Sequence, residues 1–139
     1  MKNNIARKVF STCFILSTAL MPIIGSASPA DAATRHCRNV TIKVENESGE
    51  EIKITDIDYF DPDAIGDWRS EPIGSHRVNH GDTWEKTRRL EKVNRQETTI
   101  RLDYKLRDSD GDWGYTRHVE SEPDVCRHGS TYTVTVPSH

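Results

Sequence analysis

The sequence predicts an all-β protein: an antiparallel β-sandwich of about seven strands, Ig-like in general shape, closed by one disulfide. Apolar and polar residues alternate with a period of two in three separate runs, which is typical of strands with one buried face. Turn-forming residues separate these runs at short intervals. Two cysteines, Cys37 and Cys126, lie near opposite ends of the predicted folded region, which indicates a small cross-linked domain.

Residues 1–32 are predicted to be a signal peptide. Lys2, Arg7 and Lys8 form a positive n-region, and Phe10–Ile24 is a predominantly apolar stretch. Cleavage is expected after Ala32, because Ala30-Asp31-Ala32 fits the small-residue rule, and Gly25-Ser26-Ala27 is an alternative site. The predicted location is therefore secreted or periplasmic.

Residues 33–139 are predicted to form a single β-sandwich domain. The chain has 19 Lys and Arg and 22 Asp and Glu residues, of which three and one lie within 1–32. The remaining 16 basic and 21 acidic residues give a net charge of −5, which argues against nucleic-acid binding. No second long apolar segment follows, so we expect no transmembrane segment after signal cleavage.

A disulfide between Cys37 and Cys126 is the expected role of the two cysteines. In an exported chain, a pair of thiols forms a disulfide more often than a metal or catalytic site. Cys37 precedes the first predicted strand, and Cys126 lies a few residues before the last. The bridge should therefore hold the first and last strands side by side.

The first predicted strand covers Val40–Val44, where Val40, Ile42 and Val44 alternate with polar residues. Glu51–Phe60 follows after the turn Asn46–Glu50, which predicts a hairpin. The apolar phase within Glu51–Phe60 slips by one residue, and such a slip indicates a β-bulge.

The later strands differ in the strength of their pattern. Thr98–Leu106 alternates strictly over nine residues and is the clearest strand of the sequence. An Asp-Gly turn follows this strand. The segment after the turn should form the next strand and pair with Thr98–Leu106. The other predicted strands are Ile73–Asn79, Thr83–Thr87, Asp112–Val119 and Thr131–Val136.

The turn after Thr98–Leu106 is the best candidate metal site. Asp108, Asp110 and Asp112 surround Gly111, and carboxylates at alternate positions of a loop suit Ca²⁺. The full EF-hand pattern is absent, and Asp and Gly are also the usual residues of a hairpin turn. A solvated turn is the favoured interpretation, so no cofactor is expected and calcium is the alternative.

Two groups of residues suggest a binding surface. Trp68 and Trp113 lie near loop ends, where exposed aromatic rings suit stacking on sugars or anchoring at a protein interface. Lys86, Arg88 and Arg89 belong to a local basic stretch that continues to Lys92 and Arg95. If these side chains shared a face, they would attract an acidic partner or lipid headgroups.

No nucleophile elbow, P-loop or dinucleotide fingerprint occurs in the chain. The favoured function is therefore a small exported, non-catalytic binding protein that recognises a protein partner, in the manner of an inhibitor or immunity protein. The alternative is a module that binds a surface glycan or a membrane surface, assisted by calcium. A small secreted hydrolase is the third hypothesis.

Overall fold

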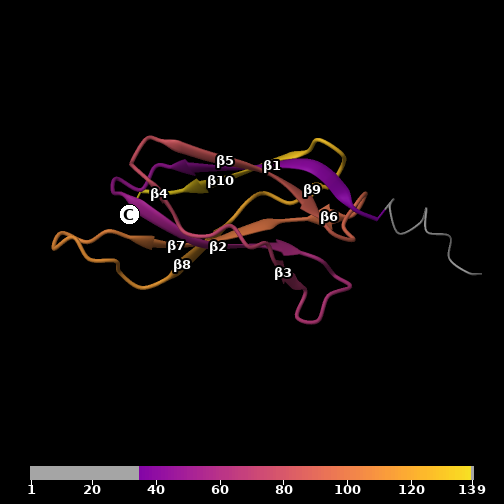
Figure 1. Cartoon of the computed structure of the whole chain (residues 1–139), viewed down its shortest axis with the longest axis horizontal. Helices are drawn as coiled ribbons and strands as arrows, with labels where there is room; N and C mark the ends of the chain where they lie inside the picture. Colours follow the sequence, from indigo (N-terminus) through magenta and orange to yellow (C-terminus); the bar gives the residue numbers. More distant parts are fainter. Residues whose placement is uncertain (1–34, 139) are drawn as a thin grey trace, which may run out of the picture.

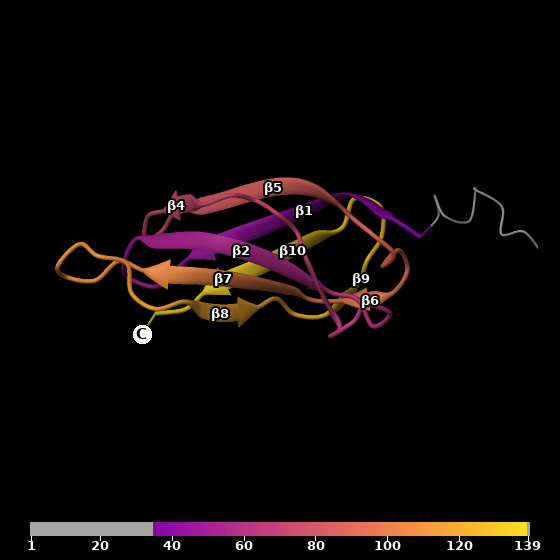
Figure 2. The ribbon, with the colours of Figure 1, turned by 60° about the horizontal axis from the view of Figure 1, so that its bottom comes forward.

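The computed structural model describes residues 35–138, and every regular element among them is a strand. Two sheets face each other as the layers of an elongated sandwich (Figures 1 and 2). The predicted all-β sandwich is confirmed, although it has ten strands, several of them very short. The predicted signal peptide, 1–32, lies outside the described residues. Within them, no helix has the length and apolarity needed to cross a membrane.

The first sheet has three strands in the order β10-β1-β5. Its members are β1 (Cys37–Asn46), β5 (Thr83–Leu90) and β10 (Thr131–Val136). The first and last strands are neighbours, as predicted from the cysteines. Their pairing is parallel, however, whereas β1 and β5 pair antiparallel, so this sheet is mixed rather than purely antiparallel.

The second sheet has five strands, with β2 and β7 at its centre. Its members are β2 (Ile52–Phe60), β3 (Trp68–Ser70), β4 (His76–Val78), β7 (Ile100–Leu106) and β8 (Arg117–Glu120). Both β3 and β4 pair with β2, at opposite ends of that strand. A separate small ribbon pairs β6 (Glu97–Thr98) with β9 (Asp124–Val125).

The strand that the sequence marked most clearly is divided in the structure. Thr98 belongs to β6 and the strand resumes as β7 at Ile100, because Thr99 leaves the ladder and its carbonyl accepts a hydrogen bond from the Phe60 amide. The predicted pairing of this strand with the segment after the Asp-Gly turn is confirmed, but β8 begins only at Arg117. The predicted bulge in β2 is also confirmed, since the β2–β7 register shifts between Ile54 and Asp56.

The predicted hairpin at Asn46–Glu50 is wrong, because β1 and β2 lie in different sheets. The buried Asn46 side chain organises this crossing: its amide donates to the carbonyls of Glu50 and Val78. The side-chain Oδ1 of Asn46 in turn accepts from the hydroxyl and backbone N–H of Ser48. A buried amide with these partners directs the chain from one layer to the other.

The apolar faces of both sheets meet in one core. The period-two pattern places these residues there, since alternate side chains of a strand point to the same face. Residues with no exposed surface come from four main strands: Val40, Ile42, Val44, Ile52, Ile54, Ile57, Ile100, Leu102, Val134 and Val136. Leu90 and Val93 close the core beside the disulfide.

The predicted Cys37–Cys126 disulfide is present, and both cysteines are fully buried. Cys37 is the first residue of β1 rather than a residue before it, and it lies opposite Leu90 of β5. The bridge joins residues 89 positions apart in the chain. Such a bond is compatible with an extracellular or periplasmic location.

Candidate functional site

The disulfide fixes one end of the sandwich, where four chain segments meet: 35–39, 61–67, 91–96 and 126–130. We call this surface the disulfide end; it lies on the right in Figure 1, beside β6 and β9. Segment 91–96 is tied to the bridge by its backbone. The Arg95 amide donates to the Cys126 carbonyl at 2.7 Å, and the Cys126 amide donates to the Gln96 carbonyl at 2.8 Å. The Asn94 amide donates to the Arg35 carbonyl at 3.0 Å.

Unusual backbone geometry gathers at this end. Within 35–138, the non-glycine residues with a left-handed φ are Asn39, Asp67, Lys92 and Arg95. This conformation costs an L-residue on the order of 1 kcal/mol, and glycine adopts it without that cost. Lys92 and Arg95 carry long basic side chains where glycine would be easier to accommodate. Backbone strain of this kind concentrates at functional sites.

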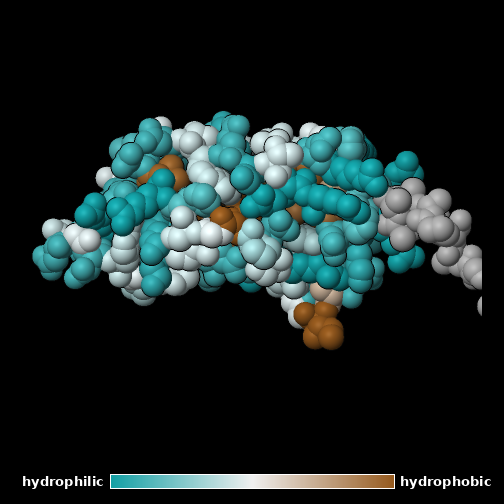
Figure 3. Space-filling model, in the orientation of Figure 1, coloured by the Kyte–Doolittle hydropathy of each residue, from teal (hydrophilic) through white to brown (hydrophobic). Residues whose placement is uncertain are grey.

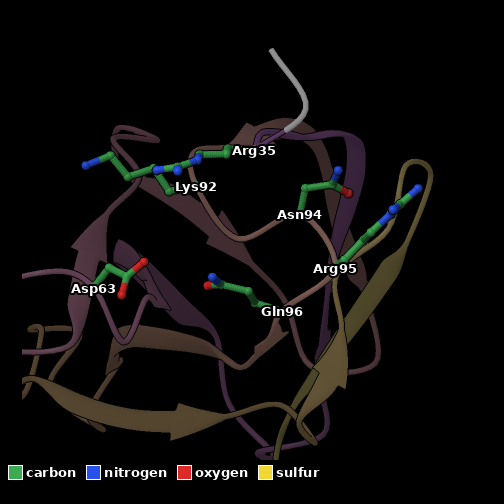
Figure 4. Close-up of a pocket in the computed structure, with 6 residues that line it drawn as sticks. All are labelled: Arg35, Asp63, Lys92, Asn94, Arg95 and Gln96. Atoms are coloured by element: carbon green, nitrogen blue, oxygen red, sulfur yellow. The ribbon is translucent and has the colours of Figure 1, made fainter. Parts of the chain in front are cut away.

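Two hollows adjoin each other on either side of Asn94 and Arg95. The first has a volume of about 500 Å³ and is lined by Arg35, Asp63, Lys92, Asn94, Arg95 and Gln96 (Figure 4). The second has a volume of about 560 Å³ and is lined by Asn94, Arg95, Val125, Arg127 and His128. In Figure 4, Arg95 points away from the first hollow, while Asp63 and Gln96 lie on opposite sides of it. Together the hollows form one basic surface.

Within residues 35–138, no ion pair neutralises the cations of this surface. The ion pairs between described residues involve Lys43, Arg69, Arg88, Arg101 and Arg107, and none of these side chains lines either hollow. Arg35, Lys92, Arg95 and Arg127 are exposed. The Gln96 Oε1 atom is buried and has no hydrogen-bond partner among residues 35–138. A buried acceptor without a donor is costly. The exposed Asp63 carboxylate also lines the first hollow, and an N–H group of a ligand can donate to it.

The neighbouring β2–β3 loop presents an isolated apolar side chain. Ile65 is fully exposed, at 104% relative accessibility. Figure 3 shows a hydrophobic protrusion at the position of this loop. Asp63 of the same loop lines the first hollow, so Ile65 and the basic surface belong to the same end of the molecule.

The base of this loop is fixed by Asp61, which has no exposed surface. Its carboxylate forms an ion pair with Arg69 and accepts the Asp63 amide at 3.0 Å. Its backbone N–H donates to Asp67, and its carbonyl accepts from Ala64. Ile65 is therefore held out into solvent by an ordered turn.

The basic residues singled out from the sequence do not all share one face, although Arg88 and Arg89 line a common hollow with Arg38. Cross-strand pairing places Lys86 beside Ile42 and Arg88 beside Val40, on the core side of the sheet edge, so Arg89 lies on the outer face. Arg88 pairs with Glu71 at 3.0 Å, while Lys86 is exposed. Lys92 and Arg95, from the same sequence stretch, instead line the two hollows.

Trp68 and Trp113 lie far apart. Trp68 begins β3, directly after the 61–67 loop. Trp113 follows the Asp108–Asp112 turn and forms an isolated bridge with Arg107. The Arg101 guanidinium is 4.3 Å from the centre of the Trp68 ring, and the Phe60 ring meets Trp68 edge-on at 5.7 Å. Lys53 and Arg77 lie 5.8 Å and 5.5 Å from the Trp113 ring. Both rings are half-buried and already stack with cations of the same chain. A sugar would have to displace these contacts.

The Asp108–Asp112 turn lies at the opposite end of the sandwich. The Asp108 carboxylate accepts the backbone N–H groups of Asp110 and Asp112, at 3.2 and 2.8 Å. In the part of the chain that the structure describes, no group of three or more His, Cys, Asp or Glu side chains is placed to hold a metal. The hydrogen bonds account for Asp108 as a turn residue, and calcium binding stays a prediction.

Asp103 offers a test of the electrostatics of the second sheet. Burial raises the pKa of its carboxyl, and Asp58 and Asp56 add to the shift, while Arg101 and His118 oppose it. The folded state therefore binds this proton more tightly than the unfolded state does. Asp103 accordingly lowers stability as the pH rises from the ordinary pKa of an Asp carboxyl through its raised pKa in the folded state.

Asp103→Asn is accordingly expected to raise the melting temperature at pH 7. The gain should shrink as the pH falls through 4 and below, where the carboxyl becomes protonated in the unfolded state as well as in the folded state. Melting curves across this range check the expectation, with the exposed Asp110→Asn as control. A gain that does not depend on pH would contradict it.

Several residues of the disulfide end could not be grouped from the sequence. Arg35 and Arg127 flank the two cysteines, but only the fold brings them to one surface with segment 91–96. Ile65 had a weak signal, because it is a lone large apolar residue in an acidic loop.

Searches against protein-family models, curated proteins and solved structures find no match to this chain.

Proposed function

We propose that this protein is a small exported, non-catalytic binding protein that recognises a protein partner through its disulfide end. The observation that carries the proposal is Ile65, a fully exposed aliphatic side chain on an ordered loop. Protein interfaces have an apolar centre within a polar rim, and Ile65 would supply part of that centre. A fixed backbone reduces the entropy lost when the interface forms.

The charges around Ile65 favour a protein over a membrane as the partner. Asp63 and Asp67 flank it and are both exposed. Anionic headgroups would repel these carboxylates, and inserting the loop among lipids would bring them out of water. A protein pocket can accept Ile65 and place polar or basic groups opposite the two carboxylates.

The test compares Ile65→Asp with Tyr115→Asp, which changes another large exposed hydrophobic residue of the described chain, 71% accessible and near the opposite end. Both variants should keep the stability of the parent protein within about 0.5 kcal/mol, because both side chains are exposed. The parent protein and Tyr115→Asp, immobilised, should retain the same protein from culture supernatant or periplasmic extract, and Ile65→Asp should not.

Titration calorimetry with the purified partner then measures the difference directly. A loss of tenfold or more in affinity for Ile65→Asp, corresponding to about 1.4 kcal/mol, supports the proposal. A partner that binds Ile65→Asp as tightly as the parent protein would contradict it. An inhibitor-like or immunity-like role further requires that stoichiometric binding reduce the activity of that partner.

A further inference from the structure

We infer that the basic surface of the disulfide end binds an acidic segment of the protein partner. The surface consists of Arg35, Lys92, Arg95, Arg127 and His128, which line the two adjoining hollows. This inference rests on the proposed function and gives the chemistry of the partner: carboxylate side chains on an extended or loop segment.

The positive charge of this surface is a local excess in an acidic chain. The predicted mature chain is acidic overall, yet four guanidinium or ammonium groups gather here without an ion pair to another described residue. Arg guanidinium groups bind carboxylates with two parallel hydrogen bonds. Neither the sandwich core nor the disulfide needs these side chains, since all four are exposed.

The backbone holds this surface ready for a ligand. Lys92 and Arg95 keep left-handed conformations, and the amide of Arg95 is bound to the Cys126 carbonyl. The hydrogen bond from Gln96 to Val93 closes the same turn at 3.0 Å. The disulfide therefore positions the basic side chains in advance, which lowers the entropic cost of binding.

Acceptor groups inside the first hollow favour a polypeptide over other anions. The buried Gln96 Oε1 has no donor in the described part of the chain, and the exposed Asp63 carboxylate lies across the hollow from Gln96 (Figure 4). A peptide supplies both carboxylates for the cations and backbone N–H groups for these acceptors. Phosphate and sulfate groups bring negative charge without such donors, so they leave these acceptors unpaired.

The probe is an N-acetylated, C-amidated hexaglutamate peptide, titrated against the disulfide-intact protein at low salt. Lys92→Glu and Arg95→Glu should each weaken binding about tenfold, since each replaces an attraction by a repulsion. Lys86→Glu is the matched control: it makes the same charge change at an exposed residue that lines neither hollow, and it should bind as the parent protein does. Binding should also fall as salt is added.

Arg95→Gly separates recognition from folding. It removes the side chain and also relieves the left-handed strain, so it should bind the peptide more weakly while its melting temperature stays equal or rises. A variant that loses binding only because it is unfolded would instead have a lower melting temperature than the parent protein. Lower stability of Arg95→Gly, together with unchanged peptide affinity, overturns the inference.

Three other results would overturn it. These are no measurable peptide binding, equal weakening by Lys86→Glu, and tighter binding of a heparin hexasaccharide than of the peptide. The last result would assign the surface to a sulfated glycan. The peptide titration does not involve Ile65. If the peptide does not bind, the capture of a partner through Ile65 can still be observed. If no partner is captured through Ile65, the peptide affinity is unaffected.

Discussion

Replacing both Cys37 and Cys126 by serine is expected to lower the free energy of unfolding by about 4.5 kcal/mol, the largest effect of any change considered. The bridge joins residues 89 positions apart, and closing a loop of that length removes much of the conformational entropy of the unfolded chain. A small, polar domain has a modest core, so this loss is a large part of its total stability.

The same change should loosen the basic surface, because segment 91–96 is bound to Cys126 through two backbone hydrogen bonds. Urea unfolding of the double variant measures the stability, and hexaglutamate titration below its unfolding midpoint measures the surface. The Cys37→Ala/Cys126→Ala variant is the control, since it opens the same loop without placing hydroxyl groups in the core. A loss of less than 1 kcal/mol in both double variants would show that the bridge is not the main constraint at this end.

Asp61→Ala is expected to lower the free energy of unfolding by about 3 kcal/mol, the second largest effect. Asp61 is fully buried, and its removal leaves the Arg69 guanidinium without its partner. It also removes the acceptor of the Asp63 amide, which shapes the loop that presents Ile65. Denaturant unfolding measures the first effect, and affinity for the partner captured through Ile65 measures the second.

Asp61→Asn distinguishes the two functions of this carboxylate. The amide keeps an oxygen that can accept the Asp63 N–H but loses the charge that pairs with Arg69. It should therefore destabilise the protein while preserving more of the loop and of partner binding than Asp61→Ala does. If both variants are fully folded under the conditions of the binding measurement and bind the partner with equal affinity, Asp61 does not shape the binding loop.

The sequence predicted the buried faces of the strands well, because the alternation of apolar and polar residues indicates directly which side chains are buried. Ile42, Ile54 and Leu102 are buried as the pattern requires. The bulge in β2 was also predicted, since a phase slip changes which residues face the core. Alternation does not specify the partner of a strand, however, and for that reason the turn after Asn46 was assigned to a hairpin although it crosses between the sheets.

The candidate site was predicted only in fragments. The basic stretch was recognised, but Lys86, Arg88 and Arg89 are separated by the pleat of β5, and only Lys92 and Arg95 line the two hollows. Their neighbours Arg35 and Arg127 lie about 90 positions apart in the chain. Left-handed geometry at Lys92 and Arg95 has no sequence signal, because neither residue type favours it.

The sequence by itself determined the all-β class, the buried faces of the main strands and the cysteine pairing. The alternation that marks a buried face lies within each strand, and the disulfide involves only two residues. Tertiary structure alone decided that β1 and β10 run parallel, that β1 and β2 lie in opposite layers, and that Ile65 and the basic surface share one end. These features depend on how distant strands share a core, a choice that the pattern within any single strand leaves open.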